Sequence, residues 1–164
     1  MVKHLILVRH AQASAAVTGQ QDKHRTLTAQ GYQDAVRVGR YGREQHWSID
    51  GILSSTALRA QTTAELIAEQ LHFDLSKITF REELYQASVR TMLEEINQQT
   101  EDCHQLLLVG HNPAISHLVE YLTGQATLNM APAGVVKLTF GVPWEAVSQQ
   151  TATLIYTLLP EQRT

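Results

Sequence analysis

Four residues from three separate stretches of the chain have side chains suited to phosphate chemistry. Arg9 and His10 are adjacent, Arg59 lies far along the chain, and His111 lies further still. An arginine guanidinium stays charged and presents paired donors that match phosphate oxygens. A neutral imidazole can attack phosphorus without a metal ion, and a protonated one can donate to the phosphoryl oxygens. We therefore expect a phosphate site wherever the fold brings these side chains together.

Short, continuously apolar runs at residues 5–8, 52–53 and 106–109 precede these stretches. Such runs are typical of parallel strands that helices cover on both faces. Ligands bind outside the carboxyl ends of parallel strands, so the four side chains are expected to meet at one sheet edge. Arg59 is expected in the first turn of a helix, where the helix dipole disfavours a cation. A bound phosphate would resolve that conflict.

Segments of helical period lie between the expected strands. The expected helix N-caps are Thr28, Ser55 or Thr56, Ser88 and Asn112, with Gly124 ending the fourth helix. In the first helix the inward-facing residues are expected to be Tyr32, Ala35, Val36 and Gly39. Residues 135–140 and 151–158 are expected to be strands that pair as a hairpin at one edge. We expect one α/β domain over residues 1–164, a three-layer sandwich with a largely parallel sheet.

Composition limits the kinds of partner. The chain has 164 residues and a net charge of −3, so there is no basic excess for a nucleic-acid surface. No apolar stretch reaches the roughly 18 residues of a membrane span, and no signal peptide is recognisable. Cys103 is the only cysteine, which excludes an intrachain disulfide and agrees with a reducing compartment. We expect a cytoplasmic protein that binds neither nucleic acid nor membrane.

Four sequence elements, in this order, resemble the histidine phosphatase superfamily, which includes cofactor-dependent phosphoglycerate mutase. They are Arg9-His10-Ala11, residues 25–31 (similar to Arg-x-Leu-Thr-x-x-Gly), residues 54–62 (similar to Ser-x-x-x-Arg-x-x-x-Thr) and residues 109–113 around the second histidine. The short chain and the His-Asn-Pro sequence are most similar to SixA-type phosphohistidine phosphatases. The resemblance implies a phosphoglycerate mutase-like fold, no cofactor, and a pocket without the insertions that cover it in sugar-phosphate enzymes.

The resemblance also implies roles for individual residues. His10 would be the phosphorylated nucleophile, with Arg9, Arg59 and His111 completing the phosphate pocket and Arg25 contacting phosphate or substrate at its rim. Glu83 is the best match to the acid or base that many members use, with Glu82 as its competitor. SixA-type members can lack this carboxylate, since phosphohistidine already has a good leaving group. The implied partner is a phosphorylated protein, with a histidine-phosphotransfer domain as one candidate.

Other functions remain open at this point. The same machinery could hydrolyse a small phosphomonoester, such as a sugar phosphate or a nucleotide-related compound. A non-catalytic phosphate-binding module would be expected to lack the nucleophile or a phosphate arginine, and the sequence lacks neither. A metal enzyme would need further ligands beside His10 and His111, and no metal-type spacing accompanies them. A mutase would need a covered pocket, for which the chain is short.

Overall fold

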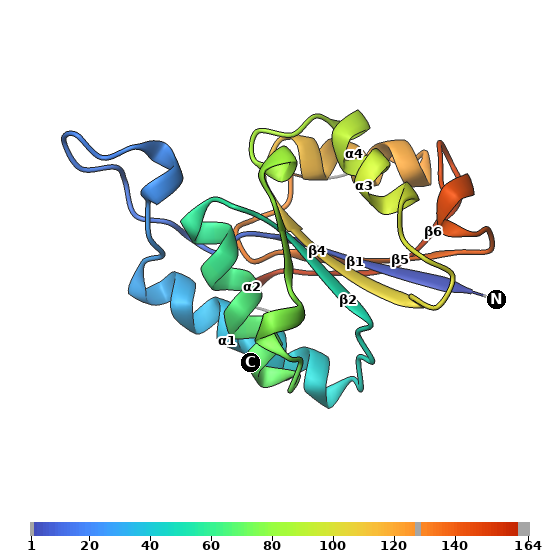
Figure 1. Ribbon diagram of the computed structural model, residues 1–164, viewed down its shortest axis with the longest axis horizontal. Helices are drawn as coiled ribbons and strands as arrows, with labels where there is room; N and C mark the ends of the chain where they lie inside the picture. The colour runs from blue at the N-terminus through green and yellow to red at the C-terminus, as the bar shows by residue number, and fades with distance from the viewer. Residues whose placement is uncertain (1, 127–128, 161–164) are drawn as a thin grey trace.

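The computed structural model describes residues 2–126 and 129–160, which fold around one six-stranded sheet (Figure 1). The strands are β1 (Lys3–Arg9), β2 (Gly51–Ser55), β3 (Thr79–Arg81), β4 (Gln105–Gly110), β5 (Val135–Phe140) and β6 (Ala152–Leu158). Their order across the sheet is β3-β2-β4-β1-β5-β6. The first four are parallel, while β5 is antiparallel to β1 and β6 to β5. The expected largely parallel sheet with a strand pair at one edge is confirmed.

Helices cover both faces of this sheet. They are α1 (Ala29–Glu44), α2 (Leu58–Gln70), α3 (Val89–Asn97) and α4 (Ala114–Thr123). Short 3₁₀ turns are η1 (Asp22–His24), η2 (Leu75–Lys77), η3 (Glu82–Leu84) and η4 (Trp144–Ala146). The helices α1 and α2 lie on one face, and α3 and α4 on the other (Figure 1). This arrangement is the three-layer sandwich that the sequence predicted.

The central strand β1 explains why its sequence is continuously apolar. Leu5 and Leu7 belong to the core cluster under α3 and α4, whereas Ile6 and Val8 belong to the cluster under α1 and α2. All four side chains are fully buried. Successive side chains of a strand point to opposite faces, so a strand between two helical layers must be apolar at every position.

The registers of the parallel strands bring three chain segments to one edge. Arg9, the last residue of β1, lies opposite Gly110, the last residue of β4. On the other side of β4, Ser54 of β2 lies opposite Val109. The segments that follow β1, β2 and β4 therefore leave the sheet side by side, which is the arrangement that a shared site needs.

Expectations about the buried face of α1 and the start of α4 are wrong. Tyr32 is 47% exposed rather than inward-facing, because the buried face of α1 consists largely of small residues that let α2 approach closely. Asn112 does not cap α4, whose N-cap position is taken by Pro113. Instead, the Asn112 amide donates to the Met130 carbonyl (2.9 Å) and its oxygen accepts from the Ser116 hydroxyl (2.6 Å).

The other helix ends are as expected except at the start of α2, where neither Ser55 nor Thr56 is the N-cap. Thr28 and Ser88 accept hydrogen bonds at the starts of α1 and α3, and Gly124 ends α4 in the left-handed conformation. The N-cap of α2 is Ala57, whose N–H donates to the Ser55 hydroxyl (3.1 Å). None of the helices in the described part of the chain has the length and apolar character that a membrane crossing requires.

Candidate active site

His10 leaves the end of β1 as a buried, neutral imidazole. The main-chain N–H of His10 donates to the Gly110 carbonyl (3.1 Å), which fixes the residue against β4. The ring Nδ1 lies 2.8 Å from the Ala11 carbonyl oxygen, which can only accept. Nδ1 must therefore carry the hydrogen, and Nε2 keeps its lone pair. Burial, with Arg59, Arg9 and Arg25 adding to it, lowers the pKa of His10 to about 4.

Arg59 lies in the first turn of α2, where its side chain is only 8% exposed. One Nη donates to the Asp22 carbonyl (2.8 Å) and the other to an Asp22 carboxylate oxygen (3.0 Å). Asp22 therefore fixes the plane of the guanidinium at the pocket. Thr63 ties this turn to the nucleophile segment, since its hydroxyl donates to the Arg59 carbonyl (2.7 Å) and accepts from the Ala11 N–H (3.0 Å).

Arg9 approaches the same space from β1. One of its Nη groups donates to the Met130 carbonyl at 2.9 Å. Its Nε is buried and has no hydrogen-bond partner among the described residues. A buried donor without a partner is costly, so an incoming anion that accepts from it would remove that cost.

His111 follows β4 and faces His10. The two ring centroids are 5.1 Å apart. Its Nε2 lies 2.8 Å from the hydroxyl of Ser55, which fixes the ring from the end of β2. Burial, with His10 and Arg59 adding to it, lowers the pKa of His111 to about 3, so this imidazole is also neutral. A phosphoryl dianion bound beside it would favour its protonated form.

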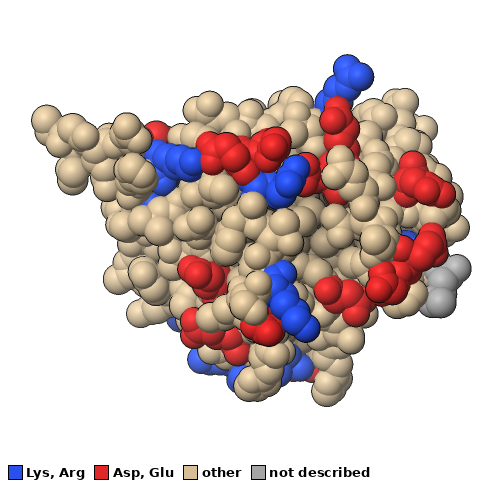
Figure 2. Space-filling model, viewed as in Figure 1, with Lys and Arg blue, Asp and Glu red and all other residues tan. Residues whose placement is uncertain are grey.

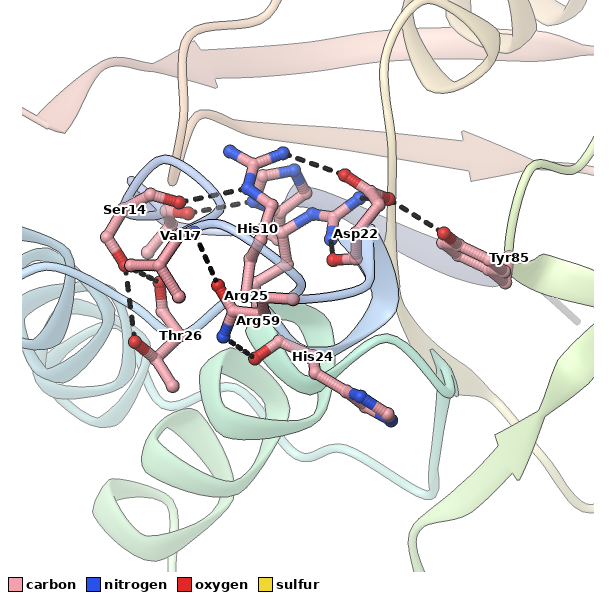
Figure 3. A network of polar contacts seen from close by, with 11 residues as sticks. His10, Ser14, Val17, Asp22, His24, Arg25, Thr26, Arg59 and Tyr85 are labelled. Carbon is pink, nitrogen blue, oxygen red and sulfur yellow. Dashed lines mark hydrogen bonds and ion pairs between the residues drawn. The ribbon is translucent and has the colours of Figure 1, made fainter.

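Asp22 connects the charged side of the pocket (Figure 3). Its carboxylate accepts from Arg59, from Arg25 (2.9 Å) and from the Tyr85 hydroxyl (2.7 Å). Arg25 is held further by a bond from its Nε to the Ser14 carbonyl (2.9 Å). The bonds from Tyr85 and Arg25, followed by Arg59, hold the pKa of Asp22 well below its usual range. Asp22 is therefore an anion at working pH and has no proton to give.

These side chains line one pocket of about 280 Å³. The lining residues are Arg9, His10, Asp22, Arg25, Arg59, Tyr85, Gln86, His111 and Asn112. Among these described residues there are three arginines and one carboxylate, so the pocket is electropositive and suited to a phosphate dianion. Of the residues singled out in the sequence, Arg9, His10, Arg25, Arg59 and His111 are brought together here.

The two candidate carboxylates lie outside this lining. Glu83 is exposed and pairs with Arg81 at 3.6 Å. Glu82 accepts hydrogen bonds from Lys23 and Thr56. In this structure, therefore, neither glutamate is positioned to donate a proton in the pocket.

Among the described residues, no group of three or more His, Cys, Asp or Glu side chains is placed to hold a metal ion.

Sequence reasoning missed Asp22, Tyr85, Gln86 and the link from Ser55 to His111. Asp22 stands three residues before Arg25, and this spacing was a signal that the two could pair. Nothing local indicates that the segment folds back over Arg59. Ser55 was expected to be a turn or cap residue, and it does accept from the Ala57 N–H as well as contacting the histidine.

Comparison with known proteins agrees with this fold. Residues 5–85 match the model of the histidine phosphatase superfamily (branch 1). An uncharacterized protein of Mycobacterium tuberculosis is 30% identical over 159 residues, which cover 90% of this chain and 96% of that protein. The chain belongs to the histidine phosphatase superfamily.

Two solved structures narrow the similarity. One, from Agrobacterium tumefaciens, is provisionally described as the phosphohistidine phosphatase SixA, with 30% identity, a TM-score of 0.82, and coverage of 96% of this chain and 99% of that one. Another SixA with the same provisional description, from Nakamurella multipartitia, gives 25% identity, a TM-score of 0.85, and coverage of 98% and 97%. The fold and the superfamily together define a phosphatase of the histidine phosphatase type.

Proposed function

We propose that this protein is a metal-independent phosphatase that removes phosphate from phosphohistidine in a partner protein, through a phosphorylated His10. The observation that carries the proposal is the buried, neutral His10, with the lone pair of Nε2 retained because Nδ1–H is held by the Ala11 carbonyl. Arg9, Arg25 and Arg59 supply the positive charge that a phosphoryl group needs as it is transferred.

The first step exchanges one imidazole for another. The Nε2 lone pair of His10 attacks phosphorus, and the bond between phosphorus and the substrate's ring nitrogen breaks. Its electron pair returns to that ring, which already holds a proton on its other nitrogen and leaves as neutral imidazole. His10 becomes the phosphorylated imidazolium, its Nδ1–H still donating to Ala11. No proton changes hands, so no general acid is required.

The second step is hydrolysis of phosphorylated His10. Water attacks phosphorus, the bond to Nε2 breaks, and both hydrogens of the water leave with the dihydrogen phosphate ion. His10 returns to its neutral form. Arg9, Arg59 and His111 are proposed to hold the phosphoryl oxygens in both steps. The dianion favours protonation of His111, which can then donate to an oxygen.

The choice of phosphohistidine rests on what lines the pocket. An ordinary phosphomonoester releases an alkoxide unless an acid protonates it. Asp22, the carboxylate among the described lining residues, is held ionised, Glu82 and Glu83 lie elsewhere, and a protonated His111 is assigned to a phosphoryl oxygen. The names of the two SixA structures support the same substrate. Asp22 is half exposed and Gln86 is exposed, so the pocket is open to a side chain from another protein.

We also propose a cytoplasmic location, where the buried thiol of Cys103 stays reduced.

The test is to trap the intermediate and locate it. Protein mixed with a phosphohistidine peptide is quenched in base and analysed by mass spectrometry. We expect acid-labile phosphate on His10, none in His10→Ala, and no turnover by that variant, which should still fold. Phosphate on another residue, or turnover by His10→Ala, would refute the mechanism.

Two further measurements bear on substrate and metal. A phosphohistidine peptide is expected to have a higher kcat/KM than a panel of sugar phosphates and nucleotides, and preference for the panel would favour the small-molecule alternative. Activity is expected to persist after treatment with a chelator such as EDTA. Activity that is lost and then restored by a divalent cation would end the metal-independent proposal.

A further inference from the structure

A second pocket of about 280 Å³ adjoins the phosphate pocket. Its lining residues are Leu84, Gln86, Ala87, Met92, His111, Asn112, Pro113 and Ala114. Three of these, Gln86, His111 and Asn112, also line the phosphate pocket. A group attached to a phosphoryl held beside His111 can therefore extend directly into this second space.

The two sides of His111 differ in chemistry. On one side lie Asp22, Arg25 and Arg59, with their charges paired. On the other, the deeper wall is formed by Leu84 and Met92, which are 2% and 1% exposed and belong to the core beneath α3 and α4. A phosphorylated imidazole that holds a proton on its other nitrogen is a cation, so the arginines repel it, whereas its flat face can pack against the apolar wall.

Gln86 stands at the border between the two pockets. Its backbone is left-handed, with φ of 58°, although it is not a glycine. Its side chain is exposed and makes no hydrogen bond with any described residue. A strained backbone at the rim of a site is a feature of functional positions, where it aims a side chain. A free carboxamide offers an oxygen that can accept and an NH₂ that can donate.

We propose that the apolar pocket is the subsite for the imidazole ring of the substrate phosphohistidine, and that the carboxamide oxygen of Gln86 accepts the N–H of that ring. This inference rests on the proposed function. The leaving ring must keep its proton on the nitrogen remote from phosphorus, so that it departs as neutral imidazole. Gln86 is then the counterpart of the Ala11 carbonyl, which holds the equivalent proton on His10.

The test compares two substrates that share a P–N bond and differ in the ring. A phosphohistidine peptide carries imidazole, whereas phosphoramidate carries only an amino group. The measured quantity is the ratio of kcat/KM for the peptide to kcat/KM for phosphoramidate. Gln86→Ala removes the carboxamide, and Ala87→Leu fills the apolar pocket. Each is expected to lower the ratio about tenfold, the scale of one lost contact in a specificity pocket.

Two further variants test whether a change in the backbone, or the loss of any left-handed glutamine side chain, could explain a fall in the ratio. Gln86→Gly also removes the carboxamide but relieves the left-handed backbone, so it is expected to lower the ratio as Gln86→Ala does. Gln150 is another left-handed glutamine (φ of 58°) and lines neither pocket, so Gln150→Ala is the matched control and should leave the ratio unchanged.

The outcomes separate this inference from the proposed function. An unchanged ratio in the Gln86 and Ala87 variants, or an equal fall in Gln150→Ala, would overturn the subsite while leaving the phosphatase intact. Failure of the unaltered protein to release phosphate from the peptide would overturn the proposed function, and the imidazole ring as ligand with it. A selective fall of the ratio in the variants at the apolar pocket would establish the subsite.

Discussion

At the residue scale, the balance of charge around Arg59 decides what the pocket can bind. A guanidinium that is 8% exposed keeps its charge and must be balanced by a nearby anion. The carboxylate of Asp22 supplies that anion, and its main-chain carbonyl accepts a further hydrogen bond from Arg59. Asp22 cannot balance Arg9, Arg25 and Arg59 together, so an excess of positive charge remains for a phosphoryl group.

Arg59→Ala is predicted to lower kcat/KM for the phosphohistidine peptide by at least about 30-fold. This corresponds to about 2 kcal/mol of lost transition-state stabilisation, the scale of one pre-organised donor. Arg90→Ala is the control, because Arg90 is 89% exposed on α3 and pairs only with Glu94 among the described residues. Steady-state kinetics of both variants check this. A lowered melting temperature with unchanged kcat/KM would show that Arg59 only stabilises the fold.

Protonation of His10 gives a second prediction. Its pKa in the folded protein is about 4, below the ordinary value of 6.5. Between these values the unfolded chain binds a proton that the folded protein does not. The stability from neutral His10 is therefore complete above about pH 6.5 and is lost as the pH falls towards 4. Buried His111 acts in the same direction.

An NMR titration of the ring C–H signals is the measurement, with His10→Ala identifying the His10 signal. We expect a midpoint near pH 4. A midpoint at 6.5 would contradict the burial on which neutral His10 depends. Urea unfolding at pH 7 and pH 5 should show a larger loss of unfolding free energy in the unaltered protein than in His10→Ala.

How far the sequence predicts the site depends on which contacts are local. The positions of Arg9, His10, Arg59 and His111 follow from strand ends, and strand ends can be recognised from short apolar runs. Asp22 could not be assigned, because its contact with Arg59 spans 37 positions and depends on the path of an irregular loop. Residues that act through such a loop have no periodic signal in the sequence.

At the element scale, the pairing of α1 with α2 shows where a pattern of hydrophobic residues fails. Tyr32 and Val36 suggested the inner face, but Tyr32 is exposed and Val36 only half-buried. The buried face includes Gly31, Gly39 and Gly42 instead. Small residues carry little weight in a hydrophobic pattern, although they decide how closely two helices approach. Gly39 was nevertheless expected to face inward, and that expectation is confirmed.

Gly39→Ala is predicted to lower the free energy of unfolding by about 1–3 kcal/mol, the usual cost of overpacking. A Cβ at this position would lie 2.6 Å from Cβ of Gln70 and 3.0 Å from Cα of Ile67. Helix propensity alone would make alanine the better residue, so the sign of the change identifies packing as its cause. Gly141→Ala is the control, with nothing within 4 Å of its added Cβ. Urea unfolding of both variants measures the difference, and a stabilised Gly39→Ala would contradict the close approach of the helices.

At the scale of the whole molecule, the distribution of charge and a projecting segment bear on the partner that the proposed function requires. On the face that Figure 2 shows, the described acidic and basic side chains are interspersed rather than gathered into one basic area. Part of the segment between β1 and α1, residues 10–28, projects from the body of the molecule (Figure 1). It also carries Asp22 and Arg25 of the pocket, so a partner whose phosphohistidine enters the pocket must approach this segment.

Val17 gives the prediction that belongs to this scale. It is 68% exposed in the projecting segment, so a partner that packs against this segment would bury it. Val17→Asp is predicted to raise KM about tenfold for a histidine-phosphotransfer domain phosphorylated on histidine, since burying a valine contributes about 1.5 kcal/mol. Turnover of a short phosphohistidine peptide should not change. Leu75→Asp is the control. Leu75 is 42% exposed in η2, which precedes the amino end of β3, whereas the pocket lies beyond the carboxyl ends of the parallel strands. Equal effects of Val17→Asp on the domain and the peptide would show that the projecting segment shapes the pocket and does not contact the partner.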